Sequence, residues 1–173
     1  MESQMSFETV CRIFCIDDGS LPDISFDFGQ QRAVGDAYAL IQSRATHLVS
    51  KYPYYWSRSR SEECAINFGE NPALALLAGE AEPFHVVFGG LRSADGASIP
   101  DLGVFVLDDN FIALDYRMGP QWDAPAILGL FEIIRGLKAL ANSAAISHTG
   151  NLFDTDEDIL LSAFNTWSNA RRH

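Results

Sequence analysis

Histidine and cysteine are the residues best suited to hold a metal ion, and their spacing in this chain does not fit a metal site. No histidine has a second histidine or a cysteine at ligand spacing, and the H-E-x-x-H pattern is absent. The acidic run at residues 154–158 lacks the glycine and the later glutamate of a calcium loop, and it suits the positive end of a helix better. We therefore predict no metal site. The histidines are His47, His85, His148 and His173.

Motifs for nucleophilic catalysis and for phosphate binding are also missing. The sequence has no G-x-S-x-G elbow, P-loop or dinucleotide fingerprint, and no helix pattern opens directly behind Gly89-Gly90. Cys11, Cys15 and Cys64 are too few and too scattered for a disulfide framework, so we interpret them as buried free thiols. We predict no catalytic residue and no cofactor, and thus a protein that is not an enzyme.

Two pairs of adjacent carboxylates, Asp17-Asp18 and Asp108-Asp109, lie in turn-like segments. Adjacent side chains in a turn splay apart, so they do not form the converging pair that acid–base catalysis requires. Turn chemistry accounts for both pairs. Exposed carboxylates can also imitate phosphates and pair with the Lys and Arg of a basic protein, which makes these four residues candidates for contact with a partner.

One strand end brings unlike polar groups together. Asp115 and Arg117 fall on the same face of the strand, and an ion pair that locks the following turn is the favoured interpretation. An enzyme site built from these two residues with His85 or His148 is the alternative, and a cleft where the side chains converge with perturbed pKa values would favour it. Trp122, just before the next helix, is either a hydrophobic staple or an exposed anchor.

The segment at residues 52–60 is dense in aromatic residues and arginine. Tyr, Trp and Arg dominate the hot spots of protein interfaces, so Tyr55 and Trp56 are candidates for partner contact. The same segment could instead be a loop that covers the core, with its arginines extended to solvent. The sequence favours neither interpretation.

The pattern of polar and apolar residues predicts a single α+β domain over residues 8–173, preceded by a disordered tail at residues 1–7. Its clearest features are a β-hairpin at about 102–107 and 111–117 and a wide apolar stripe over 123–141. So wide a stripe is typical of a helix packed on a sheet, and hairpin connections favour a mainly antiparallel sheet. We expect further helices over residues 30–50, 71–78 and 155–171, and further strands over residues 8–16, 24–28, 84–88 and 144–146.

The charge of the chain narrows the class of partner. Acidic residues outnumber Lys and Arg by 23 to 12, for a formal net charge of −11. Such a balance opposes nucleic acid binding and would attract a cationic protein, although solubility alone would also explain it. No segment has the basic start and apolar run of a signal peptide, and none is long enough to span a bilayer. We therefore expect a cytoplasmic protein without membrane contact.

The run from Ile112 to Trp122, continuing into the amphipathic pattern behind it, resembles small immunity proteins of bacterial polymorphic-toxin and type VI secretion systems. These are often acidic α+β domains with a strand, an L-D-Y-R-x-G-like turn and a helix. Residues 112–119 read I-A-L-D-Y-R-M-G. The resemblance lies around residues 110–140 and brings no set of contact residues with it.

The resemblance implies a cytoplasmic protein that needs no cofactor, binds a cognate toxin and blocks its active site. A basic nuclease is the toxin class that an acidic surface would fit best, through an acidic loop with an aromatic anchor. The candidate contact residues, chosen from their chemistry, are Asp17, Asp18, Tyr55, Trp56, Asp108, Asp109 and Trp122. The oligomeric state, monomer or homodimer, stays open.

A small-molecule-binding or regulatory α+β domain is the main alternative, with its pocket on the apolar face of the sheet. Two further alternatives, ranked lower, are an enzyme with an unfamiliar site and a subunit of a larger assembly.

Overall fold

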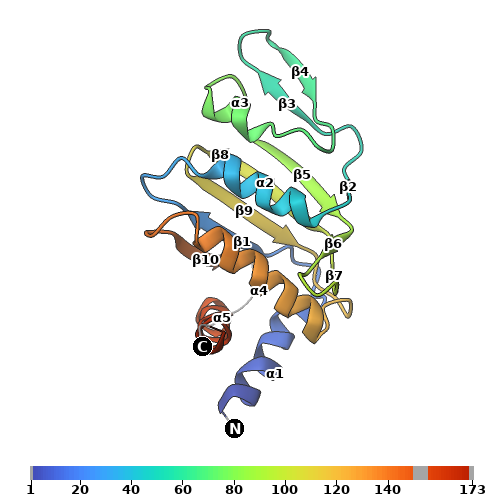
Figure 1. Cartoon of the computed structure of the whole chain (residues 1–173). Coiled ribbons are helices and arrows are strands. Elements are labelled where there is room, and N and C mark those ends of the chain that lie inside the picture. Colours follow the sequence, from blue (N-terminus) through green and yellow to red (C-terminus); the bar gives the residue numbers. More distant parts are fainter. Residues whose placement is uncertain (1, 150–155, 172–173) are drawn as a thin grey trace.

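Six strands pair into one antiparallel sheet, in the order β10 (Ala145–Thr149), β1 (Asp23–Asp27), β9 (Phe111–Tyr116), β8 (Leu102–Asp108), β5 (Phe84–Gly89) and β2 (His47–Leu48) (Figure 1). The computed structural model describes residues 2–149 and 156–171 of the chain. The predicted hairpin is confirmed as β8 and β9, and the residues predicted as an edge strand form β10. The α+β class with a mainly antiparallel sheet is thereby confirmed.

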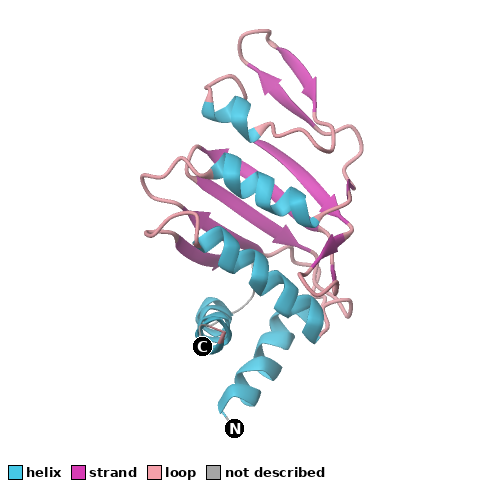
Figure 2. Ribbon diagram, viewed as in Figure 1, coloured by secondary structure: helices cyan, strands magenta, loops and turns pink. Residues whose placement is uncertain are grey.

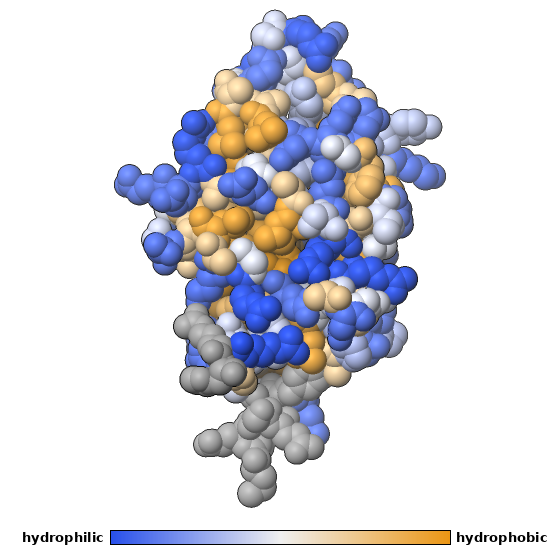
Figure 3. Space-filling model, in the orientation of Figure 1, coloured by the Kyte–Doolittle hydropathy of each residue, from blue (hydrophilic) through white to orange (hydrophobic). Residues whose placement is uncertain are grey.

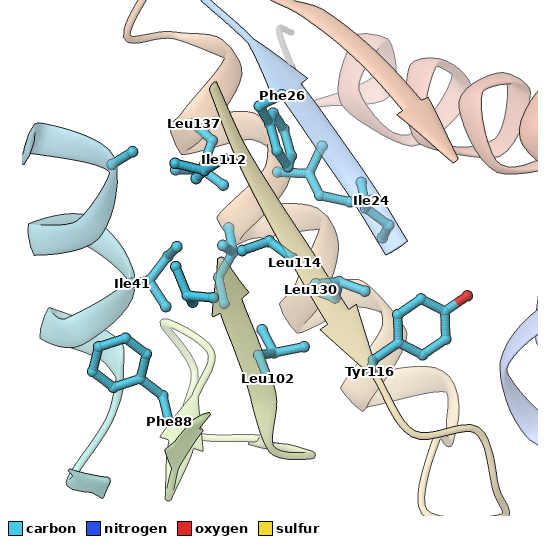
Figure 4. Packing of buried hydrophobic residues seen from close by; sticks show 14 of the residues in the cluster. Ile24, Phe26, Ile41, Phe88, Leu102, Ile112, Leu114, Tyr116, Leu130 and Leu137 are labelled. Carbon is cyan, nitrogen blue, oxygen red and sulfur yellow. The ribbon is translucent and has the colours of Figure 1, made fainter. Parts of the chain in front are cut away.

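Two helices, α2 (Val34–Arg44) and α4 (Ala124–Lys138), lie across one face of this sheet (Figures 1 and 2). Alternate side chains of the strands point toward them, and Figure 4 shows Leu114 of β9 beside Leu130 of α4. Both leucines are 0% exposed. Burial of one such side chain stabilises the fold by about 1.5–3 kcal/mol, so this covered face supplies the core.

The helix ends follow local chemistry. Asp123 caps α4, because its Oδ1 accepts a hydrogen bond from the amide of Ala126 at 2.9 Å, and the start predicted from sequence is confirmed. α2 ends at Arg44, earlier than predicted, because the chain then turns into edge strand β2. The last helix, α5 (Asp156–Ala170), matches its prediction, while residues 154 and 155 and His173 lie outside the described residues.

The N-terminal segment differs from its prediction. Helix α1 (Glu2–Cys15) takes the place of the tail expected through residue 7 and of the strand expected from residue 8. Val10, Ile13 and Phe14 are buried, and their i, i+3, i+4 spacing forms one apolar face. The β-branched and aromatic residues of this run favoured a strand. The packing of Phe14 against Trp122, with ring centroids 5.0 Å apart, overrides that local preference.

The segment between β2 and β5 forms small elements of its own. β3 (Tyr54–Ser57) and β4 (Glu62–Ala65) pair as a separate hairpin where the sequence predicted a loop, and α3 (Ala73–Leu77) follows it. Figure 1 places this hairpin at the end of the molecule opposite α1 and α5. Figure 3 shows apolar surface over α2 and α3 on this side of the molecule. Another short pair, β6 (Leu91–Arg92) with β7 (Ser98–Ile99), precedes β8.

The opposite face of the central strands carries the alternate residues. We call the surface formed by these outward residues of β5, β8 and β9 the open face of the sheet. The side chains of His85 and Asp115 on it are 37% and 15% exposed. Polar groups thus alternate with core residues along the same strands. The open face comprises His85, Val87, Gly103, Phe105, Ala113 and Asp115.

Candidate binding groove on the open face

A groove of about 660 Å³ hollows the open face at the end of β8 and β9 away from their turn. Residues of β5, β8 and β9 line it together with the loop before β1, the segment after β2, the segment before β8 and the turn after β9. The volume falls within the range of small-molecule sites and is also sufficient for a protein side chain. The lining residues are Leu21, Val49, His85, Val87, Pro100, Asp101, Gly103, Asp115, Tyr116, Arg117 and Gln121.

An imidazole and a carboxylate are joined inside this groove. Asp115 on β9 reaches across β8 to His85 on β5, with Oδ2 and Nε2 2.5 Å apart. Gly103 lies between them on β8, directly opposite Asp115. A Cβ atom at this position would overlap the Asp115 carboxylate, so the glycine provides the space that lets the two side chains meet.

A second carboxylate lies beside the first. Asp23 on β1 stands directly opposite Asp115 in the β1–β9 ladder. Partial burial raises the pKa of the Asp23 carboxyl, the negative charge of Asp115 raises it further, and His85 acts in the opposite direction. Like charges placed directly opposite on a sheet destabilise it. This pair therefore costs stability in the free protein, and a cation placed beside it would remove the cost.

The walls of the groove are apolar and accessible. Leu21 and Val49 are large hydrophobic residues that remain 55% and 44% exposed, and both line the groove. Val87 and Pro100 continue the apolar wall. Apolar walls around a few convergent polar groups are the usual composition of a binding site, so this is the strongest candidate site for function.

The structure brings three of the sequence-predicted polar residues to the groove. His85, Asp115 and Arg117 all line it. His148 does not, because it is 6% exposed and its Nε2 bonds the hydroxyl of Tyr116 at 2.9 Å. Burial lowers the pKa of His148. The favoured interpretation, an ion pair that locks the turn after the strand, is wrong: Asp115 pairs across the sheet with His85, and within the described residues Arg117 forms no ion pair.

The two acidic turns lie at different distances from the groove. Asp17 and Asp18 belong to the loop that also carries Leu21, and their carboxylates accept the amides of Gly19 and Ser20 at 3.0 and 2.9 Å. These are the turn hydrogen bonds expected from their sequence. The bonds from Ser20 lower the pKa of Asp18.

Asp108 and Asp109 lie at the turn of the β8–β9 hairpin, at the other end of the strands. At ~3.4 Å per residue this turn is on the order of 20 Å from the groove. Asp109 pairs with Arg32 at 2.8 Å, and Asp108 accepts the amide of Asp109 at 2.7 Å. The structure therefore does not bring the four candidate aspartates together.

The aromatic candidates separate into surface and interior. Trp56 and Tyr54 share the outer side of the β3–β4 hairpin and are 40% and 49% exposed. Tyr55 points the other way and packs on Phe84, with ring centroids 6.4 Å apart. The side of the hairpin that carries Tyr55 thus covers the core, and contact of a partner with the exposed side stays a prediction.

Trp122 lies in the core and leaves the set of surface candidates. It is 0% exposed, packs against Phe14 and Tyr116, and its Nε1 donates to the carbonyl of Arg117 at 2.9 Å. The interpretation of Trp122 as an exposed anchor is therefore wrong, because its indole is buried. Burial of the indole fixes the turn between β9 and α4.

Sequence reasoning missed Asp23, Leu21 and Val49 as site residues. Leu21 and Val49 lie in connecting segments, and their position depends on which strands become neighbours. Gly103 at the start of an apolar strand was the available signal, because glycine inside a strand often marks a close approach of another group. Which side chain approaches Gly103 could not be predicted without the strand register.

No three His, Cys, Asp or Glu side chains in the described ranges are gathered as metal ligands. None of the described helices has the length and apolar character needed to cross a membrane.

Comparisons with known proteins gave one similar structure. No family model matches the chain, and no curated protein matches it. It is similar to a chain in the crystal structure of the toxic C-terminal tip of CdiA from Pseudomonas aeruginosa in complex with immune protein, with 15% identity and a TM-score of 0.48. The similarity covers 77% of this chain and 87% of that chain. Similarity this low carries no inference about function.

Proposed function

We propose that this protein neutralises a toxin by binding it, and that the groove on the open face receives a basic side chain of the toxin. The observation that carries the proposal is the pair of facing carboxylates, Asp23 and Asp115, of which Asp115 lines a groove with exposed apolar walls. The toxin as the class of partner comes from the resemblance of residues 110–140 to immunity proteins. The protein would act without a cofactor in the bacterial cytoplasm, as a monomer or homodimer, against a toxin such as a type VI effector.

The chemistry of the groove suits a lysine or arginine side chain. The aliphatic stem would lie against Val49 and Val87, and the charged end would reach Asp115. An arginine could bond a carboxylate with two N–H groups at once. His85 offsets part of the repulsion between Asp23 and Asp115 in the free protein, and such a contact would offset it further.

The net charge of −11 supports the same proposal at longer range. It would steer a basic protein toward the chain and raise the association rate, an effect that weakens as salt increases. A basic nuclease is the partner of this kind that we propose, because its phosphate-binding cleft presents the cations that the carboxylates would pair with.

The size of an ordinary interface indicates which other candidates take part. A patch of about 800 Å² on each partner has a radius of about 16 Å if it is circular. A patch centred on the groove would include the loop of Asp17 and Asp18, and the β8–β9 turn with Asp108 and Asp109 would lie at or beyond its margin. We therefore propose Asp17 and Asp18 as contacts, and the exposed side of Trp56 as a separate, peripheral anchor.

Recovery of the toxin and inhibition of its activity test the proposal. The tagged protein and its Asp23→Asn/Asp115→Asn variant would be used to recover partners from a lysate of the host bacterium. We expect a basic protein that binds the unmodified chain more than the variant and whose toxic activity is abolished by equimolar addition of the chain. A recovered protein that keeps full activity when saturated with the chain would contradict the proposal, and so would recovery of no basic protein.

A small-molecule site is the second candidate, because one observation favours it. His85 is held by Asp115 through Nε2, which leaves the other ring nitrogen to exchange a proton with a ligand, and Arg117 can hold an anionic group nearby. Native mass spectrometry of the purified chain distinguishes the two. A bound small molecule that is lost in the Asp115→Ala variant would indicate that the groove serves ligand binding or catalysis instead of protein recognition.

A further inference from the structure

The geometry points to a binding site for a phosphate group in a second groove, between α4 and α5. This groove encloses about 390 Å³ and combines two cations with four neutral hydrogen-bonding side chains. Its residues belong to the last turns of α4, the segment behind it and the second half of α5, so it is separate from the open face. The lining residues are Arg135, Lys138, Ala139, Ala141, Asn142, Phe164, Asn165, Ser168 and Asn169.

The cations of this groove are not neutralised by the protein. No carboxylate lines the groove, and within the described ranges neither Arg135 nor Lys138 forms an ion pair. Glu132, one turn earlier on α4, is engaged by Arg44 and Arg171 at 3.8 Å each and by the amide of Ala94. The chain has nearly twice as many acidic as basic residues. Two neighbouring cations that form no ion pair within its described ranges are therefore available to bind an anion from outside the protein.

Aromatic rings hold these cations in place without cancelling their charge. The guanidinium of Arg135 lies over the ring of Trp167, 4.9 Å from its centroid, and Nζ of Lys138 lies 5.8 Å from the ring centroid of Phe164. Cation–π contact fixes position while leaving the N–H groups that point away from the ring free to bind. The two charges are therefore prepositioned for a ligand.

Neutral donors complete the groove. Asn165, Ser168 and Asn169 follow one another at i, i+3 and i+4 and so share one face of α5. Asparagine is a poor helix former, so helix stability alone does not explain why Asn165 and Asn169 lie on this face of α5. Asn142 adds a fourth such side chain to the lining. Amide and hydroxyl groups beside two cations are the donor set that a phosphate group requires.

The helix dipole explains only part of this arrangement. Basic residues are favoured in the last turn of a helix, which accounts for Arg135 and Lys138. The dipole does not account for the asparagines and the serine on α5. The ends of α4 and α5 contribute together about one negative charge, from roughly half a charge each, and the two formal positive charges exceed it. An anion is therefore still attracted.

A phosphate group fits better than a single carboxylate. Arginine can hold two oxygens of a phosphate at once, lysine adds a point charge, and a dianion matches the two cations. The shared chemistry is the tetrahedral phosphate, either as the free ion or as a monoester on a small molecule.

A titration followed by amide NMR of the full chain tests the assignment. Inorganic phosphate and, separately, O-phosphoserine would be added at constant ionic strength maintained with sodium chloride. We expect saturable shifts of the amides of Asn142, Asn165, Ser168 and Asn169. Stronger binding of O-phosphoserine than of inorganic phosphate would indicate a monoester ligand, and the reverse would indicate the free ion.

Two charge-matched variants make the test specific. Arg135→Gln/Lys138→Gln should weaken phosphate binding by at least about tenfold, because both charge-assisted contacts are lost. Lys51→Gln/Arg58→Gln removes one lysine and one arginine at exposed positions near β3 and should leave the affinity unchanged. If the first pair perturbs the fold, Asn165→Ala/Asn169→Ala tests the same groove without touching its cations. Shifts that never saturate, or that are equal in the two charge variants, would overturn the assignment.

Discussion

The two faces of strands β5, β8 and β9 have the same backbone and opposite roles. On the covered face, Ile112 and Leu114 are 0% exposed beneath α2 and α4. One residue further along the same strand, Asp115 crosses Gly103 to reach His85 and faces a second carboxylate. A period of two residues thus places the core on one side of the sheet and the proposed recognition site on the other. Substitutions on the two faces should therefore change different properties.

The largest expected effect lies on the covered face. Leu114→Ala should lower the free energy of unfolding by about 2–5 kcal/mol, because it removes buried methyl groups and leaves a cavity. Urea denaturation of the purified variant measures this loss. The remaining folded fraction should bind the partner with unchanged affinity, and a specific loss of affinity would break the division between the faces.

Gly103→Ala should have the next largest effect, and it acts on the open face. The added Cβ must displace the Asp115 carboxylate from His85, at a cost of about 1–3 kcal/mol in unfolding free energy. In an Asp115→Ala background the same substitution should cost much less, since nothing is left to displace. A double-mutant cycle measures the difference, and additive effects would show that Gly103 does not serve Asp115.

Asp23→Asn should make the protein more stable while weakening its function. At neutral pH it removes a like-charged cross-strand pair, for a gain of about 0.2–1 kcal/mol. The folded protein raises the pKa of Asp23, so its carboxyl binds a proton more readily than in the unfolded chain. Stability from this group therefore falls as the pH rises from the ordinary aspartate pKa to the raised one, and stays constant above it.

Denaturation of Asp23→Asn and of the unmodified protein at several pH values measures that effect. The difference in unfolding free energy between them should grow through this window and then level off. A variant that is less stable at every pH would show that Asp23 supports the fold, which would remove the reason to expect a cation beside it.

Asp109→Asn should have the smallest effect. Asp109 lies at the β8–β9 turn and pairs with Arg32, whose side chain is 60% exposed. Exposed pairs of this kind are worth little, so the unfolding free energy should change by no more than about 0.5 kcal/mol. A larger loss in urea denaturation would indicate that this turn contributes more to the fold than its exposure implies.

The elements that the sequence predicted best are those with a long, strict pattern. α4 followed from an apolar stripe behind Asp123, and the β8–β9 hairpin followed from two apolar runs around an acidic turn. α1 was predicted as a strand because its apolar residues are β-branched or aromatic, although Val10, Ile13 and Phe14 also have helical spacing. Packing against Trp122 decided between the two patterns.

The groove could be predicted only in part. The sequence indicated Asp115, Arg117 and His85 as candidates because of their polar side chains, and Asp17 and Asp18 because they are adjacent carboxylates in a turn-like segment. The pairing of Asp115 with His85 depends on the order β9-β8-β5, and the opposition of Asp23 and Asp115 depends on the register of β1 with β9. Order and register are long-range properties that a local pattern does not contain.

The affinity of the purified partner toxin for matched charge variants tests the central claim most directly. Calorimetry would compare the unmodified chain with two variants that have the same change in net charge. The groove variant, Asp23→Asn/Asp115→Asn, changes the carboxylate that lines the groove and the one opposite it. The turn variant, Asp108→Asn/Asp109→Asn, changes the hairpin turn. We predict that the groove variant loses at least about 30-fold in affinity, as expected for a desolvated charge pair, and the turn variant less than about fivefold. Equal losses, or a larger loss for the turn variant, would contradict the claim that the open-face groove is the binding site.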